Sequence, residues 1–176
     1  ILERMRPQFE ESLRRNGYQV MQWSDAGFIR FFTRQPARTL AEIKKMKLFT
    51  SAGDPASEAL LRGLGFNPIP ISASELLTAL QTRLVDAFDV PPLFALANQS
   101  FGLAKNMVDI KFAALPAATV ISVKAMESLP AQLRPQLLEA ARRAGERSRA
   151  RIRKLEEDAI AEMKKRGLNV VEPDAA

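Results

Sequence analysis

The sequence contains no side chains for thiol or imidazole chemistry, since none of its 176 residues is cysteine or histidine. This composition excludes Ser–His and Cys–His catalytic units and structural zinc sites with Cys and His ligands. No pair of carboxylates stands in a recognisable catalytic motif. The glycines of Gly63-Leu64-Gly65 end a predicted helix and do not open one around a phosphate. The residues therefore favour a binding protein over an enzyme, and we expect no cofactor and no metal.

Arg30 is the first candidate for binding. A buried arginine is costly without a partner, so its guanidinium either meets an anionic ligand or forms a salt bridge, for which Asp25 and Asp89 are the candidates. A guanidinium matches a carboxylate through two parallel hydrogen bonds. Arg30 thus predicts either an anion-binding position or a structural ion pair.

Three aromatic residues are further candidates for contact with a ligand: Trp23, Phe49 and Phe88. Side chains alternate between the two faces of a strand, so Phe49 and Phe88 each point to a ligand or to the core. The indole of Trp23, the only tryptophan, either stacks on a ligand or fills the core between two lobes. We favour the core for Trp23.

The elements that must position these residues alternate along the chain. Two capping boxes, Thr39 to Glu42 and Ser72 to Glu75, each predict the start of a helix. Helices are predicted over residues 2–16, 39–45, 54–65, 72–82, 91–99 and 124–127, with Leu60, Leu61 and Leu64 as the buried face of the third. Strands are predicted over residues 18–23, 27–33, 46–50, 67–71, 84–88, 107–112, 117–123 and 168–172. This order is typical of an α/β fold with parallel strand pairing.

The positive charge is concentrated in one segment. The chain carries 26 Lys and Arg against 20 Asp and Glu, and residues 131–166 hold 11 of the basic and 6 of the acidic side chains. Apolar residues recur there every three or four positions, which predicts a helix of roughly 30 residues within 130–166. Small residues at Ala141, Ala144 and Ser148 would let another element approach closely. The arginines are best explained as a solvated helix face.

Composition also limits the class of protein. Apolar residues make up 47% of the chain, which is enough for a sizeable core, and no apolar run approaches the roughly 18 residues of a membrane span. The chain opens with Ile1-Leu2-Glu3-Arg4, without a methionine or a signal peptide. We therefore expect a processed chain or a fragment.

Several segments from Gly27 to Val171 resemble, in the right order, the DctP family of extracytoplasmic substrate-binding proteins of TRAP transporters. The most specific segment is Glu75 to Thr82 followed by Val85-Asp86, which is similar to the family's "Evy-ALqtGvvDG" motif. The other similar segments are Gly27 to Thr33, Leu40 to Leu48, Leu64 to Ile71, Ile121-Ser122 and Leu129-Pro130. The resemblance covers nearly all of this chain and about half of the family's length.

The resemblance implies a two-lobed periplasmic-binding-protein-like fold of type II, present in part, with a long C-terminal helix that spans both lobes. Residues 27–115 would form the second lobe, with residues 156–172 packing back on it. Residues 1–26 and 116–155 would form the returning part of the first lobe, whose N-terminal segments are absent. Strands 18–23 and 117–123 would then lack neighbours, so we expect this chain either to self-associate or to lose order in part of its first lobe.

The resemblance also implies a periplasmic, non-enzymatic receptor that captures a small organic ligand in an interlobe cleft and delivers it to TRAP membrane subunits. In the family, Arg30 corresponds to a ligand-facing arginine. Phe49 stands where an arginine usually clamps the carboxylate, and Val90 stands where an asparagine usually binds the ligand. Phe88 and Asp89 also depart from the usual residues, and Arg83 replaces a glycine. A ligand with an apolar or aromatic part and at most one carboxylate is therefore expected at Trp23, Arg30, Phe49, Phe88, Asp89 and Val90.

Two other classes of protein stay open. One is a basic helical protein that binds nucleic acid through residues 131–166, although no aromatic side chain interrupts that segment to stack on bases. The other is an interaction module without a complete cleft. We expect no nucleic-acid partner.

Overall fold

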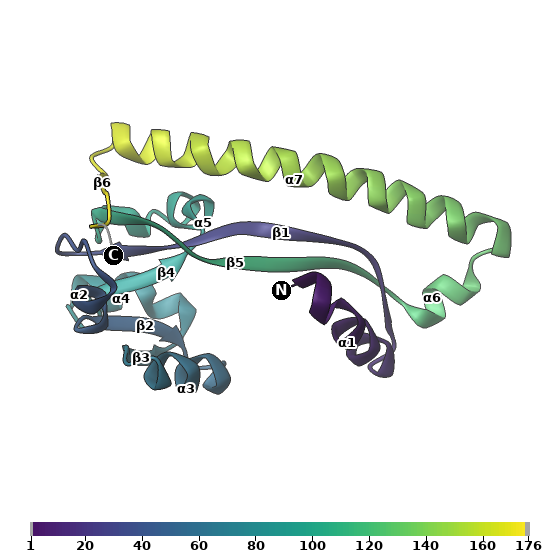
Figure 1. Cartoon of the computed structure of the whole chain (residues 1–176), viewed down its shortest axis with the longest axis horizontal. Coiled ribbons are helices and arrows are strands. Elements are labelled where there is room, and N and C mark those ends of the chain that lie inside the picture. Colours follow the sequence, from purple (N-terminus) through teal and green to yellow (C-terminus); the bar gives the residue numbers. More distant parts are fainter. Residues whose placement is uncertain (1, 175–176) are drawn as a thin grey trace. The chain divides into compact units, whose positions relative to one another are not determined.

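A mixed six-stranded sheet runs through the protein, seen here in a computed structural model that describes residues 2–174 (Figure 1). Its strand order is β3-β2-β4-β1-β5-β6. Strand β2 pairs in parallel with β3 and β4, β5 pairs in parallel with β6, and β4 runs antiparallel to β1. The α/β class is confirmed, and the expected parallel pairing holds for these strands except between β1 and β4. The strands are β1 (Tyr18–Thr33), β2 (Lys47–Ser51), β3 (Asn67–Ile71), β4 (Ala87–Val90), β5 (Asn106–Ser122) and β6 (Asn169–Val171).

The helices lie close to their predicted positions. They are α1 (Leu2–Arg15), α2 (Leu40–Lys44), α3 (Pro55–Gly63), α4 (Leu76–Gln81), α5 (Pro92–Ala97), α6 (Val123–Ser128) and α7 (Arg134–Lys165). Short 3₁₀ turns precede α4 (Ala73–Glu75), follow α5 (Ser100–Gly102) and precede α7 (Ala131–Leu133). The long helix is confirmed, with 32 residues. No helix within residues 2–174 is both long enough and apolar enough to cross a membrane.

Local capping explains where the short helices begin. The Thr39 hydroxyl accepts from the Glu42 amide at 3.2 Å, and the Glu42 carboxylate accepts from the Thr39 amide at 3.1 Å. Asp54 caps α3 by accepting from the amide of Ser57 at 3.0 Å. Each bond satisfies a backbone donor that the first turn leaves unpaired.

Two predicted breaks in the sheet do not exist. Residues 18–23 and 27–33 belong to one strand, because the chain bends at Gly27 (φ 107°) without leaving the sheet, and Asp25 accepts from the Gly27 amide at 3.1 Å. Residues 107–112 and 117–123 likewise belong to β5, which contains Pro116. Pro116 lies beyond the part of β5 that pairs with β6, which is Asn106–Val108.

Two smaller expectations are also wrong. The strand expected at residues 84–88 is β4 at Ala87–Val90, because residues 82–85 still form the turn that ends α4, where the amides of Leu84 and Val85 donate to the Ala79 carbonyl. On α3 only Leu61 is buried, while Leu60 and Leu64 are 64% and 46% exposed. The nine-residue helix contains two leucines and is followed by Leu64 as its C-cap, and it buries a narrower face than predicted.

The chain divides into two compact units. Unit 1 comprises residues 1–27 and 114–154, and unit 2 comprises residues 28–113 and 155–176. The boundaries fall inside β1, β5 and α7, so three elements continue from one unit into the other.

Unit 2 has a core on each face of its sheet. One face packs Phe32, Phe88 and Met107 against α4, α5 and Met163 of α7. The other face packs Phe31 and Val108, among others, against α2 and α3. Successive strand residues contribute to opposite cores, as alternation requires.

Unit 1 contains a close approach between β1 and α7. The expected small residue Ala144 is exposed, and Gly145 beside it is buried instead. A Cβ built on Gly145 would lie 2.0 Å from the side-chain oxygen of Gln22, whose amide nitrogen donates to Thr119 at 2.9 Å. Glycine is therefore required at this contact unless Gln22 moves.

We expect Gly145→Ala to lower the free energy of unfolding by about 1–2 kcal/mol, because overpacking outweighs the better helix propensity of alanine. Urea unfolding would measure the change. The double variant Gly145→Ala, Gln22→Ala removes the clash and should regain most of the loss. An equal loss in both variants would contradict this explanation.

Candidate functional site

Arg30 lies on β1 with a buried, incompletely paired guanidinium. Its side chain is 7% exposed, and its Nε donates to Asp109 on β5 at 3.1 Å. The buried Nη1 atom has no hydrogen-bond partner within residues 2–174. An unpaired donor in a buried site costs free energy, so this nitrogen is suited to an acceptor from outside the described chain.

The predicted alternative ion pairs of Arg30 are wrong. Asp25 instead accepts from Arg153 at 2.9 Å, within unit 1. Asp89 lies on the opposite face of the sheet, because Arg30 is paired across the strands with Val90 and Asp89 with Phe31. Asp109 was missed from the sequence, although alternation in Met107 to Phe112 places residues 109 and 111 on the face that carries Met107.

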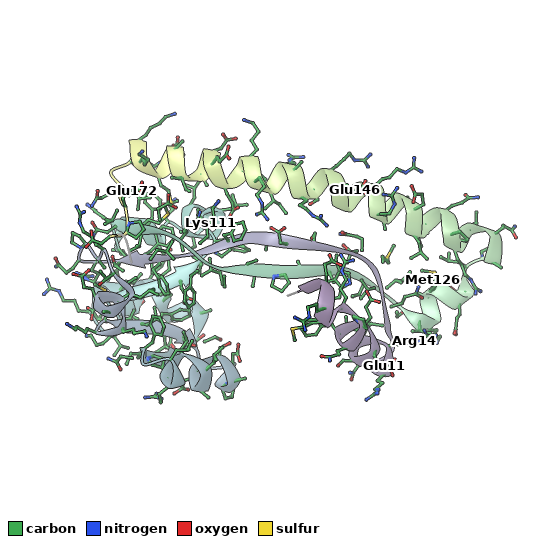
Figure 2. The ribbon with its side chains drawn as sticks, viewed as in Figure 1. Glu11, Arg14, Lys111, Met126, Glu146 and Glu172 are labelled. Atoms are coloured by element: carbon green, nitrogen blue, oxygen red, sulfur yellow. The ribbon has the colours of Figure 1, made fainter. Side chains whose placement is uncertain are left out.

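Lys111 adds a second positive charge beside this position. It follows Asp109 by two residues on β5 (Figure 2), and its Nζ lies 5.3 Å from the ring centre of Phe28, which precedes Arg30 by two residues. The amide of Phe28 donates to the buried carboxylate of Glu156 on α7 at 2.7 Å. The backbone next to Arg30 is therefore held in place by α7.

Phe49 and Val90 share the sheet face of Arg30. Val90 is the cross-strand partner of Arg30. Phe49 and Val90 are both half-buried and pack against the core that contains Phe88 and Phe32. The structure thus gathers an arginine and two apolar side chains on one face of the sheet.

Phe88 does not reach this surface, and its assignment as a ligand contact needs correction. Its side chain is fully buried and stacks on Phe32 with ring centres 5.0 Å apart. Each ring covers the other, so both serve the core.

Asp89 has an unusual environment for a carboxyl group. It is half-buried beside Phe31, and burial raises its pKa to about 7. Burial disfavours the charged form, and the hydrogen bond with the backbone of Asp89 itself offsets only part of this effect. Asp89 is consequently a group that changes protonation near neutral pH.

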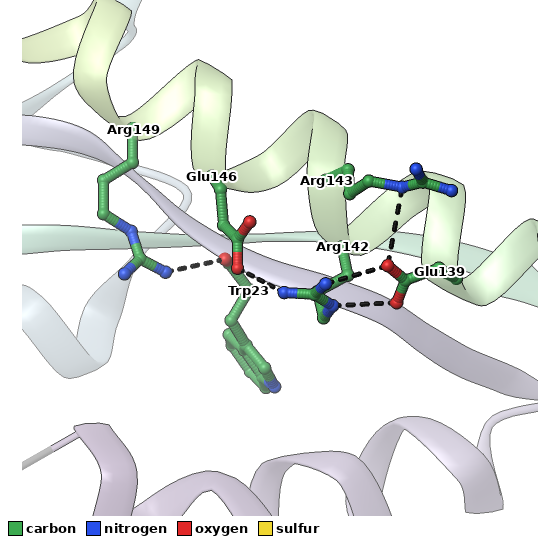
Figure 3. A network of polar contacts seen from close by, with 6 residues as sticks. All are labelled: Trp23, Glu139, Arg142, Arg143, Glu146 and Arg149. Atoms are coloured by element: carbon green, nitrogen blue, oxygen red, sulfur yellow. Dashed lines mark hydrogen bonds and ion pairs between the residues drawn. The ribbon is translucent and has the colours of Figure 1, made fainter.

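Trp23 belongs to unit 1, where its indole is already engaged. The indole N–H donates to Glu10 on α1 at 2.7 Å, and the ring lies 6.1 Å from that of Phe9. Its carbonyl accepts from Arg149 at 3.4 Å (Figure 3). These contacts join α1 and α7 to β1, and the structure does not place Trp23 in the unit that holds Arg30.

Carboxylates offset part of the positive charge of α7. Arg142 lies between Glu139 and Glu146, and Arg143 contacts Glu139 at 3.4 Å (Figure 3). The guanidinium of Arg142 holds the pKa of Glu139 below its usual range. Such pairs along the helix weaken the case for a continuous cationic surface for nucleic acid.

No group of three or more Asp and Glu side chains that could hold a metal ion is present in residues 2–174. The site on unit 2 combines a buried guanidinium, one of whose nitrogens is unpaired within residues 2–174, with apolar surface. A guanidinium of this kind matches the carboxylate of an organic anion.

Comparisons with known proteins identify the class. Residues 3–176 match the DctP family, described as bacterial extracellular solute-binding protein, family 7. The chain belongs to this family, as its sequence motifs indicated. One relative is the 2,3-diketo-L-gulonate-binding periplasmic protein YiaO of Escherichia coli, 28% identical over 139 residues, which are 79% of this chain and 42% of the relative.

Solved structures share the fold. A TRAP periplasmic solute-binding protein from Chromohalobacter salexigens with bound D-glucuronate superposes with a TM-score of 0.85 at 18% identity, covering 97% of this chain and 57% of that one. A TRAP periplasmic solute-binding protein from Desulfovibrio salexigens with bound orotic acid gives 0.83 at 20%, covering 96% and 54%. The predicted periplasmic-binding-protein fold with a long C-terminal helix is confirmed. The chain spans about half the length of the curated relatives it matches.

Proposed function

We propose that this chain is the ligand-binding part of a periplasmic TRAP-type receptor, which captures a small organic acid and delivers it to membrane subunits. Family membership supports the class, and the unpaired buried Nη1 of Arg30 is the observation that carries the assignment. Ligand binding would pair this donor and so favour the bound state of the protein.

We further assign unit 2 to the second lobe of the receptor and unit 1 to the returning part of the first. The boundaries of the two units lie close to those of the lobes that the family resemblance implies, which supports the assignment. The expected self-association of this chain stays a prediction.

The ligand that we propose has one carboxylate and an apolar or aromatic part. The guanidinium of Arg30 can bind one carboxylate. Phe49 and Val90 on the same face offer apolar area, which contributes about 25 cal/mol per Å² when buried. The relatives' ligands, which are sugar acids and orotic acid, each carry a carboxyl group that such a guanidinium would recognise. The aromatic side chain of Phe49 is our reason for proposing an aromatic acid instead of a sugar acid.

Calorimetric titration with phenylacetate, D-glucuronate and succinate tests this ligand class. We expect phenylacetate to bind most tightly, and Phe49→Arg to weaken phenylacetate by at least about tenfold, because the variant replaces apolar area with a desolvated charge. Phe94→Arg is the matched control, since Phe94 lies on α5 and is 49% exposed. Tightest binding of succinate, or equal losses in the two variants, would sink the proposed ligand class.

A further inference from the structure

Unit 2 contains a second pocket that the proposed function does not use. It has a volume of about 520 Å³ and lies where β1 ends and where β2 and β4 begin. Arg34 follows β1, Lys45 follows α2, and Arg83 follows α4. None of the residues of the Arg30 site lines this pocket, so its charges need a separate explanation.

The carboxylates of this pocket are engaged by their own neighbours. Glu42 accepts from the backbone amides of Arg38 and Thr39 at 2.7 and 3.1 Å. Asp86 lies 3.8 Å from the ammonium of Lys47 and accepts from the Lys47 amide at 3.4 Å. The charge of Lys45 helps to lower the pKa of Glu42, but within the described residues neither carboxylate lies in a close ion pair with the three cations of the pocket.

The two carboxylates of the pocket offset only part of the charge of its three cations. Arg34 donates to the carbonyl of Leu80, which is a neutral acceptor. Within residues 2–174, the side chains of Lys45 and Arg83 form no hydrogen bond and no close ion pair, although the charge of Lys45 helps to lower the pKa of Glu42. Three positive groups thus converge on one hollow, with donors still available.

Arg83 is also held in an unfavourable backbone conformation. Its φ is 60°, in the left-handed region that L-residues with long side chains rarely adopt. Its carbonyl accepts from the ammonium of Lys47, and its amide donates to Leu80 at 3.3 Å, so both ends of the residue are fixed. Glycine would meet the backbone requirement without strain, whereas arginine at this position carries a strained backbone.

We propose that Arg34, Lys45 and Arg83 form a second anion site, which takes a compact oxyanion with two negative charges on a small soluble molecule. The shared chemistry is that of a phosphate monoester or a dicarboxylate. Guanidinium groups bind such oxyanions through paired hydrogen bonds, and the ammonium adds a point charge. A hollow of this volume suits a small molecule. This proposal does not depend on the ligand of Arg30.

Inorganic phosphate and succinate are the probes, added separately to the full chain at low ionic strength in calorimetric titrations. Arg83→Gly removes the guanidinium and also relieves the backbone strain, so the variant should fold at least as well as the parent protein. We expect saturable phosphate binding that weakens by at least about tenfold in Arg83→Gly and in Lys45→Gln. Arg62→Gln, which removes an exposed arginine of α3, is the charge-matched control and should bind phosphate normally.

The outcomes separate the possible sources of the anion. Arg30→Gln should leave phosphate binding unchanged, which keeps the two sites distinguishable. Binding only to phosphatidylcholine vesicles that contain phosphatidic acid, without binding to free phosphate, would overturn the proposal. So would the absence of saturable binding by either soluble anion, or the same affinity in Arg83→Gly and the parent protein.

Discussion

Replacing Arg30 with glutamine is expected to lower the affinity for a monocarboxylate by roughly tens- to thousands-fold, since the interactions of a desolvated charge pair are worth about 2–5 kcal/mol. In the ligand-free protein the effect should have the opposite sign or be small. In the ligand-free protein the buried Nη1 has no hydrogen-bond partner within residues 2–174. Removing it therefore removes the free-energy cost of burying an unpaired donor. Titration calorimetry and thermal unfolding with and without phenylacetate measure the two effects.

The ligand affinity is the quantity that identifies a ligand-binding arginine. The stability of the ligand-free protein reports instead on the balance between losing the 3.1 Å pair with Asp109 and removing the unpaired Nη1, so a purely structural Arg30 would leave the affinity unchanged. Arg38→Gln is a suitable control, because Arg38 forms an exposed pair with Asp174 at 3.5 Å and should affect neither quantity. Unchanged ligand affinity in Arg30→Gln would remove the basis of the proposed function.

Asp109 positions Arg30 and should behave differently from it. The carboxylate is 39% exposed and fixes the Nε side of the guanidinium, which leaves the Nη nitrogens for a ligand. Asp109→Asn keeps an acceptor at that place, whereas Asp109→Ala removes it. A graded loss of affinity, larger in the alanine variant, distinguishes positioning from a purely electrostatic role.

Local signals in the sequence predicted most helix boundaries of the fold. The capping box at Thr39 and the Asp54-Pro55 start require only neighbours within one turn, and both exist as expected. The long helix α7 was equally predictable, because its apolar spacing persists through the segment. The predictions from sequence agree with the structure for elements whose stabilising contacts lie within the element.

Predictions failed where another segment decides the outcome. Gly27 looks like a strand break, yet β1 continues through it because the Gly27 amide is satisfied by Asp25 and the following residues pair within the sheet. Strand alternation allowed Phe88 to face either side, and only the cross-strand pair with Phe32 buries it. The apolar spacing predicted close packing at Ala144, whereas the close approach to the Gln22 side chain of β1 occurs one residue later, at Gly145.

The residues of the candidate site show the same difference between local signals and contacts with distant segments. The family resemblance points to Arg30, Phe49 and Val90 as single positions, and the structure places them on one face of the sheet. Asp109 and Lys111 were missed because no motif marks them, and only the order of strands brings β5 beside β1. The pairing of Arg30 is a property of the sheet, which the local sequence does not encode.

Asp89 is expected to make the protein less stable as the pH rises from about 4 to 7. Its carboxyl titrates near 3.8 in the unfolded chain and at about 7 in the folded protein, because burial disfavours the charge. Between these values the folded state binds more protons than the unfolded state, so the free energy of unfolding falls with rising pH. The stabilising effect of the neutral carboxyl is complete below the lower value and lost above the higher one.

Asp89→Asn should therefore be more stable than the parent protein at about pH 8, by up to roughly 4 kcal/mol, since each pH unit between the two pKa values is worth about 1.4 kcal/mol. The difference should shrink as the pH falls and vanish near pH 4. Urea unfolding across this range measures it. Asp54→Asn is the control with the opposite sign, because the hydroxyl and amide of Ser57 lower the pKa of Asp54. If the slope between about pH 4 and 7 is the same in Asp89→Asn and the parent protein, the carboxyl of Asp89 is ionised in the fold, and the buried face of β4 tolerates its charge.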